Sequence, residues 1–294
     1  MTLTVGTSNV KPTLARRRQV WSMGLLMTVL LAAPAAGQTD VDPGFNLFSR
    51  EQEIELGRQA ASEVEQDLPV LEDKTVQDYV RNVGGRLATQ APGAEYPYTF
   101  TVLNLAEANA FALPGGFMYV NRGLLELVDT ESQLAGVLAH EIAHVALRHG
   151  TNQASKSYLA QGGLAILGAL LGDSTAGNIA GAVSGVGMPL LFLKFSRSAE
   201  EQADAVGTQI MHGAGYDPAA LAAFFDTLEQ KSDGGPPEFL SSHPSYENRR
   251  ESIQREAAAV GGGGRSEVVG GLGGIQSRLG RLPDAPTMAD VLPQ

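Results

Sequence analysis

Apolar side chains recur every three or four positions in two segments, and this spacing predicts two amphipathic helices. The first helix covers residues 48–67 and the second covers residues 76–91. Farther along the chain, residues 98–105 and 117–121 are rich in β-branched and aromatic side chains, which favour strands. The pattern therefore predicts helices followed by a short sheet, so the expected fold class is α+β and mostly helical.

A third amphipathic helix is expected in the segment that ends with the letters LAHEIAHVALRHG. Thr130 and Gln133 have the spacing of a capping box at its start, and Gly150 is a typical stop residue after its end. A stripe of leucine, isoleucine and valine runs between these two signals. We therefore predict a single helix over residues 131–149.

This helix contains the pattern H-E-x-x-H. His140 and His144 are four positions apart, so both imidazoles project from one face and can bind the same ion. Glu141 lies beside them, where a carboxylate can take a proton from a water that the metal has acidified. The pattern predicts a zinc site with Glu141 as general base. On a continuous helix His149 faces away from the ion, and we expect it only to interact with the helix dipole.

Two histidines leave one protein ligand to be found. The best candidate lies in SRSAEEQADAVG, residues 196–207, where Glu200 and Asp204 are four apart on another predicted helix. Glu200 can bind the metal while Asp204 accepts the N–H of a ligand histidine. Glu201 is an alternative ligand, although its spacing from Ser198 also suits a capping box. Spacing alone leaves both glutamates as candidates.

Two apolar stretches that are dense in glycine and alanine lie within residues 159–195. Each stretch is short or interrupted by glycine, so a helical hairpin packed beside the site is favoured over a membrane span. A hydrophobic lid that contacts a membrane surface or a client protein is the third alternative. The segment of residues 218–230 is expected to form a helix that supports the core. Residues 260–294 are rich in glycine, which predicts a flexible tail with a short helix at residues 275–283.

The start of the chain has the form of an export signal. Three arginines at residues 16–18 precede an apolar run, and small residues near position 37 suit cleavage. We expect a signal peptide at residues 1–37 and a zinc metallopeptidase domain at residues 38–259, which predicts an exported, periplasmic protein. The formal net charge of −11 argues against nucleic acid as a partner. The chain has no cysteine, which excludes disulfides and thiolate metal sites.

Four segments carry a family resemblance: FALPGGFMYVNRGLL, LAHEIAHVALRH, SRSAEEQAD and SSHPSYENR, in that order. They resemble the gluzincin zinc metallopeptidases, which include the periplasmic proteases BepA and LoiP, the membrane protease HtpX and the CAAX prenyl proteases. The layout is closest to the short periplasmic members that have only the protease domain. The resemblance implies a zincin-like fold with one Zn²⁺ per chain, and it selects the first of the two candidate glutamates. Its matching residues imply three zinc ligands, a catalytic base and an outer partner: His140, His144 and Glu200, then Glu141, then Asp204.

The resemblance also implies roles for two further segments. In such enzymes the strand after P-G-G borders the active-site cleft and pairs with an extended substrate backbone. The expected pairing residues are Gly115, Gly116, Phe117, Met118 and Tyr119. His243 matches a histidine that can reach the zinc from a loop, as a gate or fourth ligand, and a plain surface histidine before proline is the alternative.

The expected function is a zinc endopeptidase of the cell envelope that hydrolyses unfolded or misassembled proteins. The alternative is an envelope chaperone or assembly factor that holds clients, with proteolysis secondary or gated. Contact with a membrane surface through residues 159–195 is compatible with either function. His243 and Arg249 are the candidates for stabilising the oxyanion that forms during hydrolysis.

Overall fold

A computed structural model of the chain describes most of the residues after position 43. The larger of its two compact units is Pro34–Gln294, which contains all the motifs. Two of the segments interpreted above, the signal peptide and the apolar stretches between the motifs, lie almost entirely outside the described residues. The described residues are 1–4, 6, 44–93, 95–160, 194–231, 238–244 and 248–292.

Two helices open the domain, as the apolar spacing predicts. Helix α1 is Arg50–Asp67 and begins with a capping box formed by Ser49 and Gln52. Helix α2 is Lys74–Ala88, and the side chain of Asp73 accepts hydrogen bonds from the first turn of backbone N–H groups.

A sheet of three strands follows, in the order β1-β3-β2. Strand β1 is Thr99–Leu103, β2 is Ala110–Leu113 and β3 is Phe117–Asn121, with β1 parallel and β2 antiparallel to β3. A short 3-10 turn, η1 at Pro114–Gly116, joins β2 to β3. The outer side of β1 is covered by the segment before α2, because Leu71 N–H donates to Val102 O at 2.9 Å. Among the described residues, β2 is therefore the open edge of the sheet.

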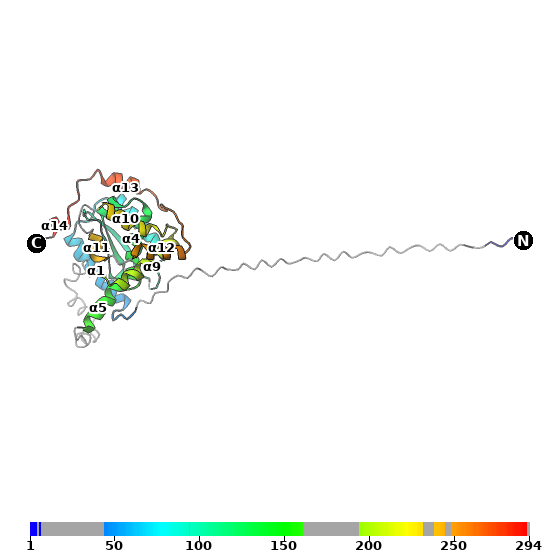
Figure 1. Cartoon of the computed structure of the whole chain (residues 1–294), viewed down its shortest axis with the longest axis horizontal. Coiled ribbons are helices and arrows are strands. Elements are labelled where there is room, and N and C mark those ends of the chain that lie inside the picture. The colour runs from blue at the N-terminus through cyan, green and yellow to red at the C-terminus, as the bar shows by residue number, and fades with distance from the viewer. Residues whose placement is uncertain are drawn as a thin grey trace. The chain divides into compact units, whose positions relative to one another are not determined.

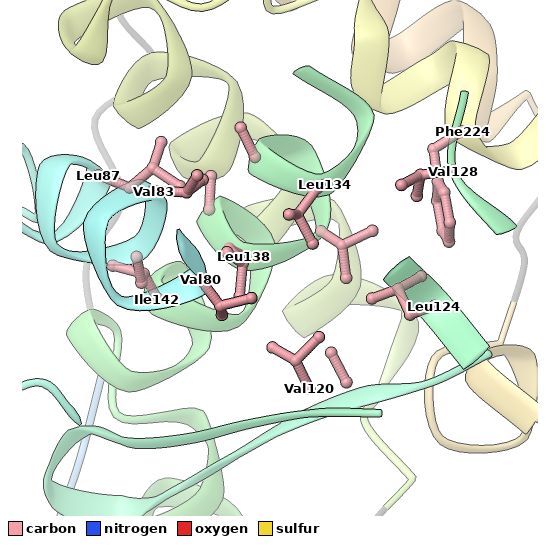
Figure 2. Close-up of a cluster of buried hydrophobic side chains, with 14 of the residues drawn as sticks. Val80, Val83, Leu87, Val120, Leu124, Val128, Leu134, Leu138, Ile142 and Phe224 are labelled. Atoms are coloured by element: carbon pink, nitrogen blue, oxygen red, sulfur yellow. The ribbon is translucent and has the colours of Figure 1, made fainter. Parts of the chain in front are cut away.

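The central helix is α4, Glu131–Ala146, which follows the short helix α3, Arg122–Leu127. All 16 residues of α4 are buried. In Figure 1 it lies in the middle of the domain, surrounded by the other helices. Figure 2 shows its core-facing side chains against α2, the sheet, α3 and the helix that contains Phe224: Leu134, Leu138 and Ile142, facing Val80, Val83, Leu87, Val120, Leu124, Val128 and Phe224.

The prediction that one helix continues to residue 149 is wrong. Helix α4 ends at Ala146, and Arg148 has a φ of 58°, a left-handed conformation that breaks the helix. A new helix, α5, then covers His149–Ala160. Because of this break, side chains after residue 147 do not follow the periodicity of α4. The direction of His149 therefore differs from the one that a continuous helix predicts.

Four helices follow in the second half of the domain. These are α9, Arg197–Ala214; α10, Ala220–Lys231; α11, Glu238–Ser242; and α12, Arg249–Ala259. Of these, α9 and α10 pack on α4, and α12 packs on α9 and α10. Helix α9 approaches α4 closely at Gly207, where an added Cβ would lie 3.1 Å from the backbone nitrogen of His140. This close approach brings the first turn of α9 to the histidines of α4.

The segment after residue 259, where a flexible tail with a short helix at residues 275–283 is expected, packs on the domain and has a helix close to the expected one. It contains α13, Leu272–Leu279, and α14, Met288–Val291. Apolar residues of α13 belong to the main core. Glu131 is fully buried at the start of α4 and holds the loop that precedes α13. Its carboxylate accepts hydrogen bonds from three backbone N–H groups of that loop and from two tyrosine hydroxyls. The donors are the N–H groups of Val268, Val269 and Gly270 at 2.8, 2.7 and 2.7 Å, with Tyr216 at 2.9 Å and Tyr79 at 3.1 Å.

The fold is thus α+β and mostly helical, as predicted, with a small sheet beside a central helix. Within the described part of the chain, every helix is too short or too polar to cross a bilayer.

Candidate metal centre

The two histidines of H-E-x-x-H project from one face of α4. Their Nε2 atoms lie 3.0 Å apart. The spacing of four residues produces this convergence, because it places the two rings one helical turn apart on the same side. Both side chains are buried.

Glu200 reaches the same point from α9. Its Oε2 lies 3.4 Å from Nε2 of His140, and its Oε1 lies 3.4 Å from Nε2 of His144. Helix α9 is capped by Ser196, not by Ser198, and this start directs Glu200 inward. Glu201 is exposed and pairs with Arg197 at 2.8 Å. The geometry therefore separates the two glutamates that spacing could not.

His243 completes the cluster from the short segment after α11. Its Nδ1 lies 3.2 Å from Nε2 of His140 and 3.1 Å from Oε1 of Glu200. Its Nε2 lies 3.2 Å from Oε1 of Glu141. Two phenylalanine rings stack on its imidazole, Phe239 with centroids 4.7 Å apart and Phe195 at 5.7 Å. His243 is thus buried inside the site and is not a surface histidine.

The four side chains fit a zinc ion. One ligand atom from each of His140, His144, Glu200 and His243 lies within 4.8 Å of all the others. Ligands of a tetrahedral zinc at about 2.0–2.1 Å are separated by roughly 3.3 Å. The nearest contacts among these four side chains are of this size, 3.0 to 3.4 Å, with Glu200 using Oε2 toward His140 and Oε1 toward His144 and His243. Nitrogen atoms and a carboxylate that face one another in a buried site favour a positive charge between them, and a metal ion supplies it.

Behind the cluster, Asp204 and Arg249 support the candidate ligands. Oδ1 of Asp204 lies 2.9 Å from Nδ1 of His140, as expected for an outer partner of a ligand histidine. Arg249 donates from Nε and a terminal nitrogen to both Asp204 oxygens at 2.8 Å, and it lies 3.0 Å from Oε2 of Glu200. Because Arg249 is buried against these carboxylates, it does not face the cleft as an oxyanion stabiliser would.

His149 does not face away from the site, in contrast to the prediction. Its Nδ1 lies 2.9 Å from Nδ1 of His144, and its Nε2 lies 3.0 Å from Oε1 of Gln202. Burial lowers the pKa of His149 to about 4. The break at Arg148 produces this arrangement, and no periodicity in the sequence signals it.

The surroundings shift the pKa values of Glu141 and Glu200 in opposite directions. Burial raises the pKa of the Glu141 carboxyl, which suits a group that must accept a proton near neutral pH. Burial also opposes ionisation of Glu200, but the neighbouring histidines outweigh it and hold the pKa of this carboxyl far below its usual value. Burial lowers the pKa of His140 as well, yet the carboxylates of Asp204 and Glu200 prevail and raise it to about 9. A site that favours a proton there also favours a metal cation.

The cleft in front of the cluster is bordered by β2, not by β3. Strand β3 is paired on both sides over residues 117–120, so the expectation that Phe117, Met118 and Tyr119 pair with a substrate is wrong. Of the two glycines in that prediction, Gly115 lines the cleft from η1. The backbone N–H of Ala112 on β2 donates a hydrogen bond to the Glu141 carboxylate.

Two histidines from one helix, a glutamate from another and a carboxylate beside the first histidine define a zinc metallopeptidase of the gluzincin class. Residues 74–257 match peptidase family M48, and the chain belongs to this family, whose members are zinc-dependent. Among the described residues, the cluster of metal-binding side chains fits that cofactor.

Proteases and metalloendopeptidases are among the proteins that the chain resembles. The chain is 30% identical to the beta-barrel assembly-enhancing protease of Escherichia coli K12 over 244 residues, 79% of this chain and 50% of that protein. It is 34% identical to the mitochondrial metalloendopeptidase OMA1 of Bos taurus over 174 residues, 56% of this chain and 33% of that protein. The chain spans about half the length of the bacterial relatives that it matches.

Proposed function

We propose that this protein is a zinc endopeptidase in which His140, His144 and Glu200 hold the metal and Glu141 is the general base. The observation that carries the proposal is the convergence of three buried side chains, with the two histidine Nε2 atoms 3.0 Å apart and one Glu200 oxygen 3.4 Å from each of them, and with the Glu141 carboxylate at the edge of the same cluster. Zinc, when bound, supplies a Lewis acid that activates a water molecule and polarises the scissile carbonyl.

The chain's own residues then move the proton. Glu141 takes it from the attacking water and delivers it to the leaving amine, and its raised pKa suits both transfers. Oδ1 of Asp204, 2.9 Å from Nδ1 of His140, is placed to accept a hydrogen bond from the Nδ1–H group, which leaves Nε2 free to bind the metal. Arg249 holds Asp204 with two hydrogen bonds, so it orients His140 indirectly.

Substrate is proposed to bind along β2. Asn121 N–H donates to Asn109 O across the β2–β3 ladder, and backbone groups in an antiparallel ladder alternate in direction. The N–H and C=O groups of Ala110 and Ala112 therefore face away from β3. The N–H of Ala110 donates to its neighbour Asn109 Oδ1 at 2.9 Å, so the backbone of Ala112, which lines the cleft, is the part of this edge proposed to meet a substrate. An extended peptide that adds to this edge is held through its backbone, which requires little of its sequence and favours unfolded substrates.

His243 is proposed to gate the site. Its Nδ1 would hold a bound ion as a fourth ligand while its Nε2 contacts Glu141, so in this arrangement the metal position and the base would both be occupied by protein groups. A structural zinc site is closed by four protein ligands, whereas a catalytic site keeps one position open. Cleavage therefore requires His243 to move away from the site and from the rings of Phe195 and Phe239 that stack on it.

The proposed setting is the cell envelope. The name of the Escherichia coli relative connects it with the assembly of β-barrel proteins, and the form of residues 1–37 supports export. We infer that the substrates are unfolded or misassembled envelope proteins. A holding function with gated proteolysis is the second candidate, and the contact between His243 and Glu141 is the observation that favours it.

The test of the enzymatic proposal compares the full zinc-loaded chain with its Glu141→Gln variant on casein, an unfolded protein. We expect cleavage by the first protein, none by the second, and equal zinc in both. Equal cleavage by both would contradict the role of Glu141. The control is Glu251→Gln, which removes an exposed carboxylate on α12 and is expected to cleave as the unchanged chain does.

The gate is tested with His243→Ala. We expect the variant to keep its zinc and to cleave casein faster than the unchanged chain. Loss of the zinc, with unfolding of the domain, would identify His243 as a permanent structural ligand instead. If the unchanged chain and the variant both keep zinc but neither cleaves casein, the holding function is favoured.

A further inference from the structure

We propose that His149 positions the metal ligand His144, by fixing the orientation and the tautomer of its ring. The inference rests on the proposed function, because it takes His144 to be a zinc ligand. Helical periodicity predicts no contact between these two residues, so the role arises from the tertiary structure alone.

The hydrogen-bond chain determines which nitrogen carries each proton. The side-chain oxygen of Gln202 can only accept, so the Nε2 of His149 that lies 3.0 Å away must donate to it. In a neutral imidazole the other nitrogen is then an acceptor, and Nδ1 of His149 lies 2.9 Å from Nδ1 of His144. Nδ1 of His144 is therefore the donor. Its Nε2, which faces the metal cluster, is left with a free lone pair.

The two candidate histidine ligands are thus supported in different ways. His140 has the carboxylate of Asp204 at 2.9 Å, the partner expected in a zincin site. His144 has a neutral imidazole in the equivalent place. A neutral acceptor draws less proton density from the ring than a carboxylate does, so it orients the ligand without strongly raising its basicity. Holding the ring in place is therefore the main effect of His149.

The break between α4 and α5 makes the contact possible. On a continuous helix, five residues at 100° each would turn His149 about 140° away from His144. The left-handed conformation of Arg148 turns the chain back. Glu53, buried on α1, holds that corner by accepting from Nε of Arg148 at 2.9 and 3.1 Å. Strained backbone of this kind is typical of functional sites, and here the left-handed Arg148 directs a buried histidine at a metal ligand.

Gln202 closes the arrangement from α9. It lies two positions after Glu200, so the helix that supplies the third candidate ligand also fixes the proton on His149. The three candidate ligands and their supporting residues thus all lie where α4 and α9 pack together, and Gly207 allows the two helices to approach closely there.

The test measures zinc affinity in the full chain by competition with a chelator. Outer partners of ligand histidines are worth about 10–100-fold in metal affinity, so we expect His149→Ala to weaken zinc binding at least 10-fold. His149→Asn offers an amide oxygen to His144 and is expected to restore most of the loss. His212→Ala removes an exposed histidine from the far end of α9, and this matched control is expected to bind zinc as the unchanged chain does.

A second variant keeps the test decisive if His149→Ala does not fold. Gln202→Ala leaves both rings in place and frees the tautomer of His149, and we expect it to weaken zinc binding several-fold with an unchanged melting temperature of the metal-free protein. Unaltered zinc affinity in the variants of both residues would overturn the proposal. Equal losses in His149→Ala and His149→Asn would also overturn it, because they would indicate a packing role.

His144→Ala separates this inference from the proposed function. If His144→Ala abolishes zinc binding while His149→Ala does not alter it, only the positioning role of His149 is wrong. If His144→Ala itself leaves zinc affinity unchanged, the assignment of His144 as a ligand is wrong, and the inference fails with it.

Discussion

Substitution of Glu131 by glutamine tests how the segment after residue 259 is attached to the domain. The glutamate is fully buried at the start of α4 and accepts five hydrogen bonds, three of them from backbone N–H groups of the loop before α13. A glutamine keeps one acceptor oxygen. If that oxygen stays with the three donors on Oε1, the new NH₂ group faces Tyr79 and the backbone N–H of Gly270.

The cost follows from these five contacts. Tyr79 can rotate its hydroxyl to accept, but the N–H of Gly270 loses its partner, which costs about 1–3 kcal/mol when buried. Each of the three remaining bonds loses its charged acceptor, a loss of about 1 kcal/mol per bond, and the lower cost of burying a neutral amide offsets part of this. We expect a net loss of about 3 kcal/mol, which corresponds to a fall in melting temperature of roughly 6–12 °C for a domain of this size.

The assay is urea and thermal unfolding of the zinc-loaded chain, combined with limited proteolysis. We expect earlier unfolding of Glu131→Gln and faster cleavage after residue 259. The control is Glu251→Gln, which removes the same charge from an exposed position on α12. A change below about 0.5 kcal/mol, within the usual range for surface substitutions, would refute the view that this carboxylate anchors the C-terminal segment.

Three further predictions follow from individual contacts. Phe195→Ala removes a ring that stacks on His243 at 5.7 Å and on His144 at 4.0 Å. Because such pairs are worth about 0.5–1.5 kcal/mol, casein cleavage at equal zinc occupancy should rise about 2- to 10-fold, and an unchanged rate would show that Phe195 does not hold the gate closed. Gly115→Ala places a Cβ 2.6 Å from the backbone of α1 at a φ of 80°, so it should lower the free energy of unfolding by more than about 1 kcal/mol, whereas Gly273→Ala, with open space around it, should not. His149 is neutral in the folded state down to a pKa of about 4, below its usual 6.5, so the unfolded chain binds more protons between these values, and stability falls as the pH falls from 6.5 to 4. In urea unfolding over this range, the unchanged chain should lose up to about 3 kcal/mol more than His149→Asn; equal pH dependence of the two proteins would contradict the buried, neutral state of His149.

The parts of the site that lie within one helix are readable from the chain. His140 and His144 converge because of a spacing of four on α4, and the stripe of apolar residues identifies that helix without knowledge of its neighbours. Spacing alone leaves Glu200 and Glu201 open as the third ligand, because both lie near the start of α9. Only the position of α9 beside α4 turns one side chain into the cluster and the other to the surface.

Three features required the tertiary structure. The position of β3 between two strands, which leaves β2 at the cleft, depends on which strands pair, and local pattern does not specify pairing order. The C-terminal segment is ordered by Glu131, although its glycine content alone favours flexibility. The direction of His149 depends on the corner at Arg148, which is held by Glu53 from a helix almost a hundred residues earlier in the chain.

The sequence by itself therefore determined the family, the fold class, the active-site helix and the first two candidate ligands, because each follows from residues that are close together in the chain or from motifs with a fixed order. The tertiary structure decided which strand faces the cleft, which glutamate joins the histidines, and how His149 and Arg249 support the candidate ligands. These outcomes depend on contacts between segments far apart in the chain, and their free energies arise only when those segments pack together.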